Sequence, residues 1–133
     1  AEYQRLVVPI HHRTLKMLNK NGLFDQLDSC ENLIITEPLG YFEFQKLIKE
    51  SSLVLTDSGG IQEETTYRRV PCLTVRENTE RPITITEGTN TLVEFNVKDI
   101  KKYLDQIFSG TYKVGEVPKY WDGKTTDRIL TIL

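Results

Sequence analysis

The stretch that decides the fold runs from residue 53 to residue 64 and reads Leu53-Val54-Leu55-Thr56-Asp57-Ser58-Gly59-Gly60-Ile61-Gln62-Glu63-Glu64. Its first four residues are typical of a short strand that is buried on both faces. A polar turn follows, and residues 61–68 have the pattern of a helix. Two adjacent glycines lie where this helix should begin, although glycine costs about 1 kcal/mol relative to alanine inside a helix. The pair indicates that another group approaches the backbone closely.

The turn after this strand has the chemistry of an anion site. The first amides of a helix have no partners within the helix and lie at the positive end of its dipole, so they suit a phosphate. Ser58, Gly59 and Gly60 are therefore candidate phosphate ligands. Glu63 and Glu64 are expected in the first helical turn, and Glu64 is placed to accept hydrogen bonds from a ribose diol. The alternative is a plain strand-to-helix turn with Ser58 or Gly59 as N-cap, and the turn alone does not exclude it.

Length and composition indicate one globular domain without a membrane span. The chain has 133 residues, 38% of them hydrophobic and 27% charged, and its net charge is −2. The charge argues against nucleic acid as a partner. No apolar run approaches the roughly 20 residues that span a bilayer, and no signal peptide is recognisable. Cys30 and Cys72 are too few for a disulfide framework or a zinc site, so no metal is expected and a reducing cytoplasm is the simplest location.

Short apolar runs alternate with helical patterns along the chain, which predicts a doubly wound, mainly parallel α/β sheet. The expected strands are 6–10, 33–36, 53–56, 72–75 and 91–95, and the expected helices are 14–20, 41–50, 61–68 and 97–108. Gly22 is a plausible stop for the first helix. A terminal helix is expected from Trp121-Asp122-Gly123 onward, with Asp122 as its N-cap.

Several segments resemble those of one enzyme family in their order and spacing. They are Pro9-Ile10-His11-His12-Arg13-Thr14, Glu37-Pro38-Leu39-Gly40-Tyr41-Phe42-Glu43-Phe44, Thr56-Asp57-Ser58-Gly59-Gly60-Ile61-Gln62-Glu63-Glu64, Thr79-Glu80-Arg81-Pro82, Glu87-Gly88-Thr89-Asn90 and Trp121-Asp122-Gly123-Lys124. Together they are similar to the UDP-N-acetylglucosamine 2-epimerase family, of the non-hydrolysing kind. His12 departs from the pattern, because the family often has proline there, and Ile83 stands where it often has glutamate.

The resemblance implies a particular fold and a particular place in it. The family resembles GT-B glycosyltransferases, with two Rossmann-like domains, and residues 1–133 look like the UDP-sugar-binding C-terminal domain truncated at its N-terminal side. The full domain resembles a sheet ordered 3-2-1-4-5-6. Its first strand and helix are absent here, which leaves five strands in the order 2-1-3-4-5 when they are counted afresh. Some exposed apolar surface is expected as a result.

The resemblance also implies an isomerase reaction. The family interconverts UDP-N-acetylglucosamine and UDP-N-acetylmannosamine by eliminating UDP to leave a 2-acetamidoglucal and then adding it back. No dissociable cofactor is implied. The partners are the UDP-sugar substrate and the missing N-terminal domain of the same enzyme, and a homodimer is left open. Most acid and base carboxylates of the family lie in that other domain, so this chain alone is expected to be inactive.

Roles for single residues follow from the same resemblance. Ser58, Gly59 and Gly60 look like the diphosphate cradle and Glu64 like the ribose-binding carboxylate. The resemblance implies that the ring of Phe44 stacks on uracil and that the backbone of Leu39 reads the uracil edge. It also implies that His11 faces the sugar and phosphates as a catalytic residue and that Arg81 lies at the ligand cleft.

Each of these residues also has a structural interpretation. Phe44 could belong to the core, since Tyr41, Phe44 and Ile48 share helical spacing. His11 could be a hydrogen-bonded structural histidine, and Arg81 a solvated surface charge. A metal site at His11 and His12 is not expected, because adjacent side chains point apart on an extended chain.

Residues 87–90 offer either a second loop near the ligand or ordinary turn chemistry. Two other functions remain open for the whole chain, a GT-B glycosyltransferase domain and a non-catalytic UDP-binding module. An assay of sugar transfer against epimerisation would separate the first of them from an epimerase.

Overall fold

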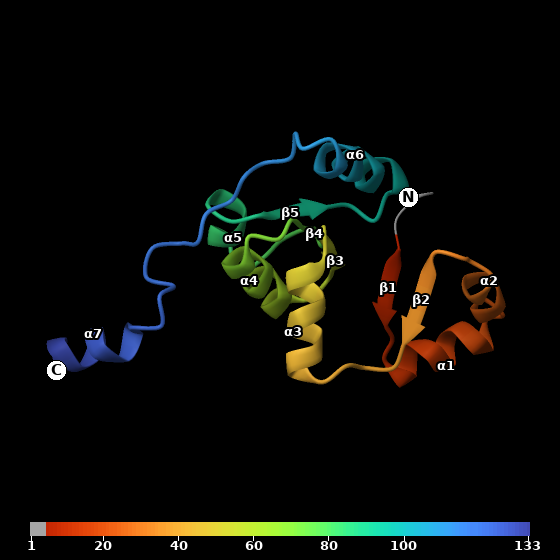
Figure 1. The fold of residues 1–133 in the computed structure, drawn as a ribbon, viewed down its shortest axis with the longest axis horizontal. Coiled ribbons are helices and arrows are strands. Elements are labelled where there is room, and N and C mark those ends of the chain that lie inside the picture. Colours follow the sequence, from red (N-terminus) through yellow and green to blue (C-terminus); the bar gives the residue numbers. More distant parts are fainter. Residues whose placement is uncertain (1–4) are drawn as a thin grey trace. The chain divides into compact units, whose positions relative to one another are not determined.

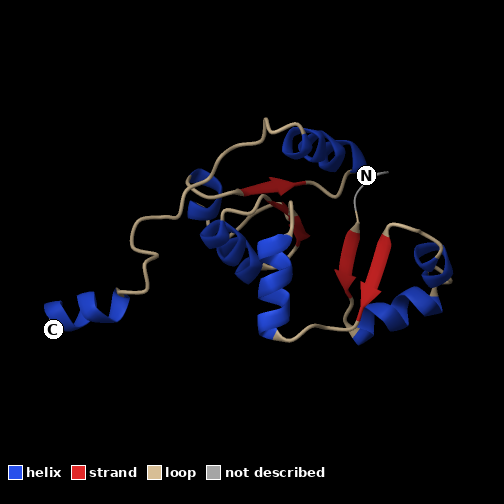
Figure 2. Ribbon diagram, viewed as in Figure 1, coloured by secondary structure: helices blue, strands red, loops and turns tan. Residues whose placement is uncertain are grey.

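The computed structural model describes residues 5–133, which group into two compact units. The first unit ends at Gln45 and the second begins at Lys46, so helix α3 (Tyr41–Glu50) crosses the division. The sequence predicts one domain. Figures 1 and 2 show both units as small α/β assemblies, and each is described by itself.

The first unit is a pair of parallel strands with two connecting helices. β1 (Leu6–Pro9) pairs with β2 (Leu33–Thr36), and the helices are α1 (His12–Lys20) and α2 (Phe24–Asp28). The stop at the end of α1 is confirmed, because Gly22 has φ 64° just after the C-cap residue. The sequence did not predict α2, which is only five residues long.

The second unit is built on three parallel strands in the order β3-β4-β5. They are β3 (Val54–Thr56), β4 (Cys72–Val75) and β5 (Asn90–Val93). Helices α4 (Gly59–Arg68) and α5 (Ile83–Thr86) connect them, and both contact β5. Figure 1 shows α4 and α5 next to each other beside these strands. With four residues, α5 is too short to give a periodic signal in the sequence.

The parallel α/β class is confirmed, but the expected five-stranded sheet is divided in two. The described ladders join β1 with β2, β3 with β4 and β4 with β5, all in parallel, and none of them joins β1 with β3. β1 and β3 each have one edge that none of the described ladders occupies.

The C-terminal part begins as predicted and ends differently. α6 (Val97–Phe108) starts after Asn96, whose side chain accepts the amide of Lys98. α7 (Thr125–Ile132) begins later than expected, and its N-cap is Lys124. The prediction that Asp122 caps it was wrong, because Gly123 turns the chain at φ 75°. Asp122 instead accepts the Lys124 amide and pairs with Arg128, which lowers the pKa of its carboxyl to about 2.

Apolar side chains are exposed on this last helix. Ile129, Leu130 and Ile132 of α7 are all exposed.

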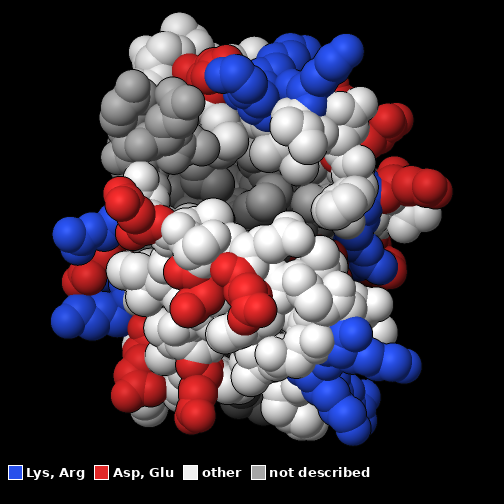
Figure 3. All heavy atoms as spheres, turned by 90° about the vertical axis from the view of Figure 1, so that its right-hand side faces the viewer, with Lys and Arg blue, Asp and Glu red and all other residues white. Residues whose placement is uncertain are grey.

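No helix within residues 5–133 is long and apolar enough to cross a membrane. On the face drawn in Figure 3, Lys and Arg side chains stand in separate groups, with acidic and uncharged side chains among them.

The interior of the second unit holds an unusual share of polar side chains. Gln62, Thr74, Thr84 and Asn90 are all 0% exposed. Asn90 connects the other three, because its Oδ1 accepts from Thr74 Oγ1 at 2.6 Å and its Nδ2 donates to Gln62 Oε1 at 3.1 Å and to Thr84 Oγ1 at 3.2 Å. Buried polar groups are costly unless they are hydrogen-bonded, so this network ties α4, β4, α5 and β5 into one arrangement.

Gly115 lets the loop after α6 cross the turn before β5, and Gly88 lets that turn pack against α4 and α5. A Cβ on Gly115 would lie 2.5 Å from the backbone nitrogen of Thr89, and a Cβ on Gly88 would lie 2.5 Å from the carbonyl oxygen of Thr84. The amide of Glu116 donates to the carbonyl of Glu87 at 2.7 Å. Gly88 therefore serves close packing, which favours the structural interpretation of residues 87–90.

Side chains of the same loop, Tyr112 and Lys113, form hydrogen bonds with backbone carbonyls around β5. The Tyr112 hydroxyl lies 2.9 Å from the carbonyl oxygen of Thr89, and the Lys113 ammonium donates to the carbonyls of Ile85 and Asn90. Burial raises the pKa of Tyr112 to about 12 and lowers the pKa of Lys113. Cys72 is buried as predicted, and burial raises the pKa of its thiol.

Replacing Asn90 should destabilise the second unit strongly. Asn90→Ala removes three side-chain hydrogen bonds from a fully buried site and leaves their partners unsatisfied. We expect the free energy of unfolding to fall by about 2–3 kcal/mol in urea titration. Asn78→Ala, in an exposed loop, is the matched control and should change it by less than about 0.5 kcal/mol. Equal effects of the two substitutions would contradict the role given to the network.

Candidate functional site

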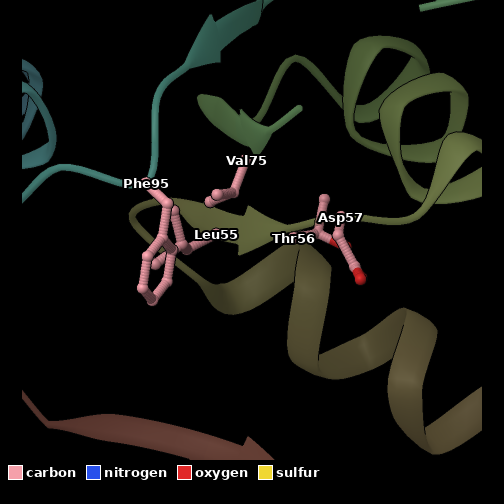
Figure 4. Close-up of a pocket in the computed structure, with 5 residues that line it drawn as sticks. All are labelled: Leu55, Thr56, Asp57, Val75 and Phe95. Carbon is pink, nitrogen blue, oxygen red and sulfur yellow. The ribbon is translucent and has the colours of Figure 1, made fainter. Parts of the chain in front are cut away.

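The carboxyl ends of β3, β4 and β5 surround a shallow hollow of about 380 Å³. In Figure 4, Leu55, Val75 and Phe95 form an apolar wall, and Thr56 and Asp57 lie on the other side, where β3 leads toward α4. Ligands of open parallel sheets bind outside the carboxyl ends of the strands. The hollow therefore lies at the expected edge. Phe95 is 93% exposed, and sequence reasoning missed it because it marked only the end of a predicted strand.

The first turn of α4 starts directly after this edge and has no side-chain cap. Ser58 is the N-cap residue, with extended backbone at φ −82° and ψ 130°, but its hydroxyl accepts no amide of the helix. Gly59 and Gly60 are the first two helical residues. A Cβ on Gly60 would have nothing within 4 Å, so the backbone of this turn borders open space. Unpaired amides beside open space are the geometry that an anion needs.

The helix begins two residues earlier than predicted, which moves its two glutamates. Glu63 and Glu64 lie in the second turn of α4 instead of the first, so the expected first-turn interaction with the helix dipole was wrong. The reason is that the glycines themselves adopt helical geometry and form the first turn. Glu64 remains one turn beyond Gly60 on the same helix and is half-buried.

Arg81 is brought to this turn from the segment between β4 and α5. A Cβ on Gly59 would lie 2.5 Å from Arg81 Nη1, so the guanidinium lies against the backbone of the first turn. Its Nε is 3.0 Å from Glu63 Oε2, an ion pair whose angle does not make a hydrogen bond, and its Nη1 is 3.3 Å from Glu80 Oε2. Arg81 is thus not a solvated surface charge.

The backbone of Arg81 is fixed by the buried polar network. Its amide donates to Thr79 Oγ1 at 3.0 Å, and Thr79 Oγ1 donates to Gln62 Oε1 at 2.7 Å. Its carbonyl accepts from Thr84 Oγ1 at 2.8 Å. Sequence reasoning missed Gln62, Glu63 and Glu80 as partners of this segment. The available signal was their position, because Glu63 follows Gly59 by one helical turn and Glu80 adjoins Arg81.

The other predicted site residues lie in the first unit and on α3. His11 is the N-cap of α1, and its Nδ1 accepts the Arg13 amide at 3.2 Å. A neutral His11 therefore carries its proton on Nε2, which points away from this hydrogen bond. The ring of His12 lies 4.0 Å from that of His11 between centroids. The expectation that the two rings point apart was wrong, because one residue is extended and the next is helical.

The turn before α3 is held by a hydrogen bond to the side chain of Glu43, in the first turn of that helix. The amide of Gly40 donates to Glu43 Oε2 at 2.8 Å, which fixes the chain between Leu39 and Phe44. Both of these residues are half-buried. The proposed core face of α3 is only partly core, since Ile48 is 2% exposed whereas Tyr41 is 66% exposed.

A metal centre is absent from the part of the chain that the structure describes. Within residues 5–133, no group of three or more His, Cys, Asp or Glu side chains could hold an ion. In the second unit, the structure brings together Ser58, Gly59, Gly60 and Arg81, with Glu64 one turn along. His11, Leu39 and Phe44 belong to the first unit.

Comparison with known proteins identifies the family of this chain. The family model described as UDP-N-acetylglucosamine 2-epimerase matches residues 1–133. The chain belongs to this family. The resemblance inferred from the motifs is therefore confirmed.

Individual members of the UDP-N-acetylglucosamine 2-epimerase family match closely over a limited part of their length. The curated UDP-N-acetylglucosamine 2-epimerase of Methanocaldococcus jannaschii is 42% identical over 128 residues, which cover 96% of this chain and 34% of the relative. A crystal structure of the enzyme from that organism, described as a complex with UDP-GlcNAc and UDP, has a TM-score of 0.82 and 41% identity, covering 96% of this chain and 35% of the solved one.

A second solved epimerase gives the same result. The Neisseria meningitidis UDP-GlcNAc 2-epimerase, described as bound to UDP-GlcNAc, has a TM-score of 0.76 and 29% identity and covers 96% of this chain and 35% of that chain. The chain thus spans about a third of the length of the relatives it matches.

Proposed function

We propose that this chain is the nucleotide-diphosphate-binding part of a UDP-N-acetylglucosamine 2-epimerase, an isomerase that interconverts UDP-N-acetylglucosamine and UDP-N-acetylmannosamine. The observation that carries the proposal is the first turn of α4, where uncapped amides border open space at Gly60 and the guanidinium of Arg81 lies against Gly59. Membership of the family supports it, as does the M. jannaschii structure described as a complex with UDP-GlcNAc and UDP.

The diphosphate binds at the first turn of α4 in this proposal. The amides of Gly59 and Gly60 and the hydroxyl of Ser58 donate hydrogen bonds to it, and Arg81 supplies a positive charge beside them. Glu64, one turn along, accepts hydrogen bonds from the ribose diol.

The uracil end of the ligand would be bound by the turn before α3. The backbone of Leu39 reads the edge of the uracil, and the ring of Phe44 stacks on its face. The half-buried state of Phe44 suits this role, since a stacking ring needs one supported side and one accessible side.

The chemistry follows from stabilising a leaving group. The C2 proton is removed, the C1–O bond breaks, and UDP departs with the bonding electrons to leave a 2-acetamidoglucal. Return of UDP to C1 and of a proton to the other face of C2 completes the epimerisation. Donors that are fixed where negative charge develops lower the barrier, and the turn at Gly59–Gly60 with Arg81 is such a set. His11, with a proton on Nε2 when neutral, is the catalytic residue that this chain contributes.

The remaining partners are proposals of the same kind. The relatives are about three times as long as this chain, so residues 1–133 would be the C-terminal domain and the remaining acid and base groups would come from an N-terminal domain. We also propose that the full-length enzyme forms a homodimer and lies in the cytoplasm.

UDP should bind this chain weakly and at a defined place. We expect a dissociation constant of about 1 mM, equivalent to about −4 kcal/mol, because the uracil, ribose and phosphate contacts remain without those to the sugar. In an amide NMR titration, Ser58, Gly59, Gly60 and Glu64 should shift most, and uridine, which lacks phosphate, should leave the first three unmoved. Shifts that spread elsewhere while this turn stays silent would rule out the phosphate cradle.

A side chain at Gly60 should block the ligand without unfolding the protein. Because nothing lies within 4 Å of the missing Cβ, Gly60→Val should change the free energy of unfolding by less than about 1 kcal/mol. It should raise the dissociation constant for UDP at least about tenfold, since the branched side chain occupies the phosphate's approach. Gly60→Ala is the graded control, with a smaller loss of affinity and a small gain in stability. Unchanged UDP binding by Gly60→Val would show that close backbone approach is not the reason for the glycine.

The chain alone should not epimerise its substrate. C2 inversion needs proton removal and return on opposite faces, and this chain contributes only His11 to that task. A coupled assay for UDP-N-acetylmannosamine should detect turnover only after a matching N-terminal domain is added. In that combination, His11→Asn should abolish turnover while the asparagine keeps an acceptor for the cap of α1. Turnover by the 133-residue chain alone would overturn the assignment of the missing groups to another domain.

A further inference from the structure

The Arg81 side chain forms an ion pair with Glu63, a residue to which neither the motif nor the proposed contacts give a role. Thr79 and Thr84 fix the backbone of Arg81 through hydrogen bonds to its amide and its carbonyl. An arginine side chain has several rotatable bonds and loses conformational entropy when it is held in one geometry. The contact with Glu63, at 3.0 Å from Nε, is the shorter of its two ion pairs.

The spacing on α4 explains why Glu63 can hold the guanidinium at that place. Residues that are four apart lie on the same face of a helix, so the carboxylate of Glu63 lies above Gly59. The guanidinium lies against Gly59, where a Cβ would come within 2.5 Å of Nη1. The bare backbone of Gly59 and the carboxylate of Glu63 thus form the binding position of the Arg81 guanidinium. The two glycines have different roles, because Gly59 makes room for Arg81 whereas Gly60 borders open space.

Glu80 accepts a hydrogen bond from Arg81 Nη1 at 3.3 Å, yet it is a weaker candidate for the same role. Its carboxylate is shared with Arg76 at 3.6 Å, and its side chain is 68% exposed, against 46% for Glu63. Exposed ion pairs fix a side chain poorly, since water and salt screen them.

We infer that Glu63 is a positioning residue, which holds the Arg81 guanidinium over the first turn of α4 so that Arg81 and the helix amides act on the same phosphate. The inference rests on the proposed function and adds a requirement to it. A carboxylate near an anion site repels the ligand, so simple electrostatics predicts that removing Glu63 strengthens binding. A positioning role predicts the opposite sign, because an unrestrained arginine must pay its ordering entropy when the ligand binds.

The experiment is a double-mutant cycle on the 133-residue chain, with UDP and uridine as probes. Glu63→Gln should raise the dissociation constant for UDP about threefold to tenfold and leave that for uridine unchanged. Arg81→Ala should raise it about tenfold or more. In the Arg81→Ala background, Glu63→Gln should cause no further loss. Glu50→Gln, which removes the same charge from the exposed pair with Lys46 on α3, is the matched control and should leave both constants unchanged.

A second measurement follows the mobility of the Arg81 side chain by NMR in the absence of any ligand. The Arg81 Nε–Hε resonance should shift and narrow in Glu63→Gln, since the side chain then loses its fixed partner. The inference is overturned if that resonance is unchanged, if Glu63→Gln binds UDP as tightly as the parent or more tightly, or if its loss persists without Arg81. A parent chain that does not distinguish UDP from uridine would instead overturn the proposed function, and the inference with it.

Discussion

The hydrogen bonds of Asn90 with Gln62, Thr74 and Thr84 are the constraint on which the second unit depends. A parallel sheet usually packs its helices through apolar side chains, whereas α4 buries Gln62, Thr65 and Thr66. Apolar contacts are non-directional, but a buried amide must meet its partners at fixed distances and angles. The network therefore sets the position of α4 relative to β4, α5 and β5 more narrowly than apolar packing would.

The same network also fixes part of the candidate site, through the short segment from Thr79 to Arg81. Thr79 links the Gln62 side chain to the amide of Arg81, so the loop after β4 and the first turn of α4 are held by the same network. A site that binds an anion needs its donors placed before the ligand arrives, because ordering them at that moment costs affinity. In the function proposed here, the polar core thus holds the backbone of Arg81 in place before the ligand binds.

Glycine has three different uses in this fold. Gly115 lets two backbone segments cross at a distance that any side chain would prevent, and Gly88 lets the turn before β5 pack against Thr66 and Thr84. Gly59 admits the guanidinium of Arg81, and Gly60 leaves open space where a Cβ would otherwise stand. The first use serves packing, and the other two serve the ligand in the function proposed here. The distinction depends on what lies within reach of the missing Cβ, which spacing in the sequence does not reveal.

The sequence by itself determined the parallel α/β class, the five strands to within two residues at their ends, and the family, since these depend on local patterns and on motif order. It also predicts an anion site at the turn Ser58–Gly60, because helix termini have the same chemistry in every protein. Only the tertiary structure decided the division into two sheets, the seating of Arg81 by Glu63, and the burial of residues 88–90. These features arise from contacts between segments that are distant in the chain, such as Asn90 with Gln62 or Gly115 with Gly88, and local patterns carry no record of them.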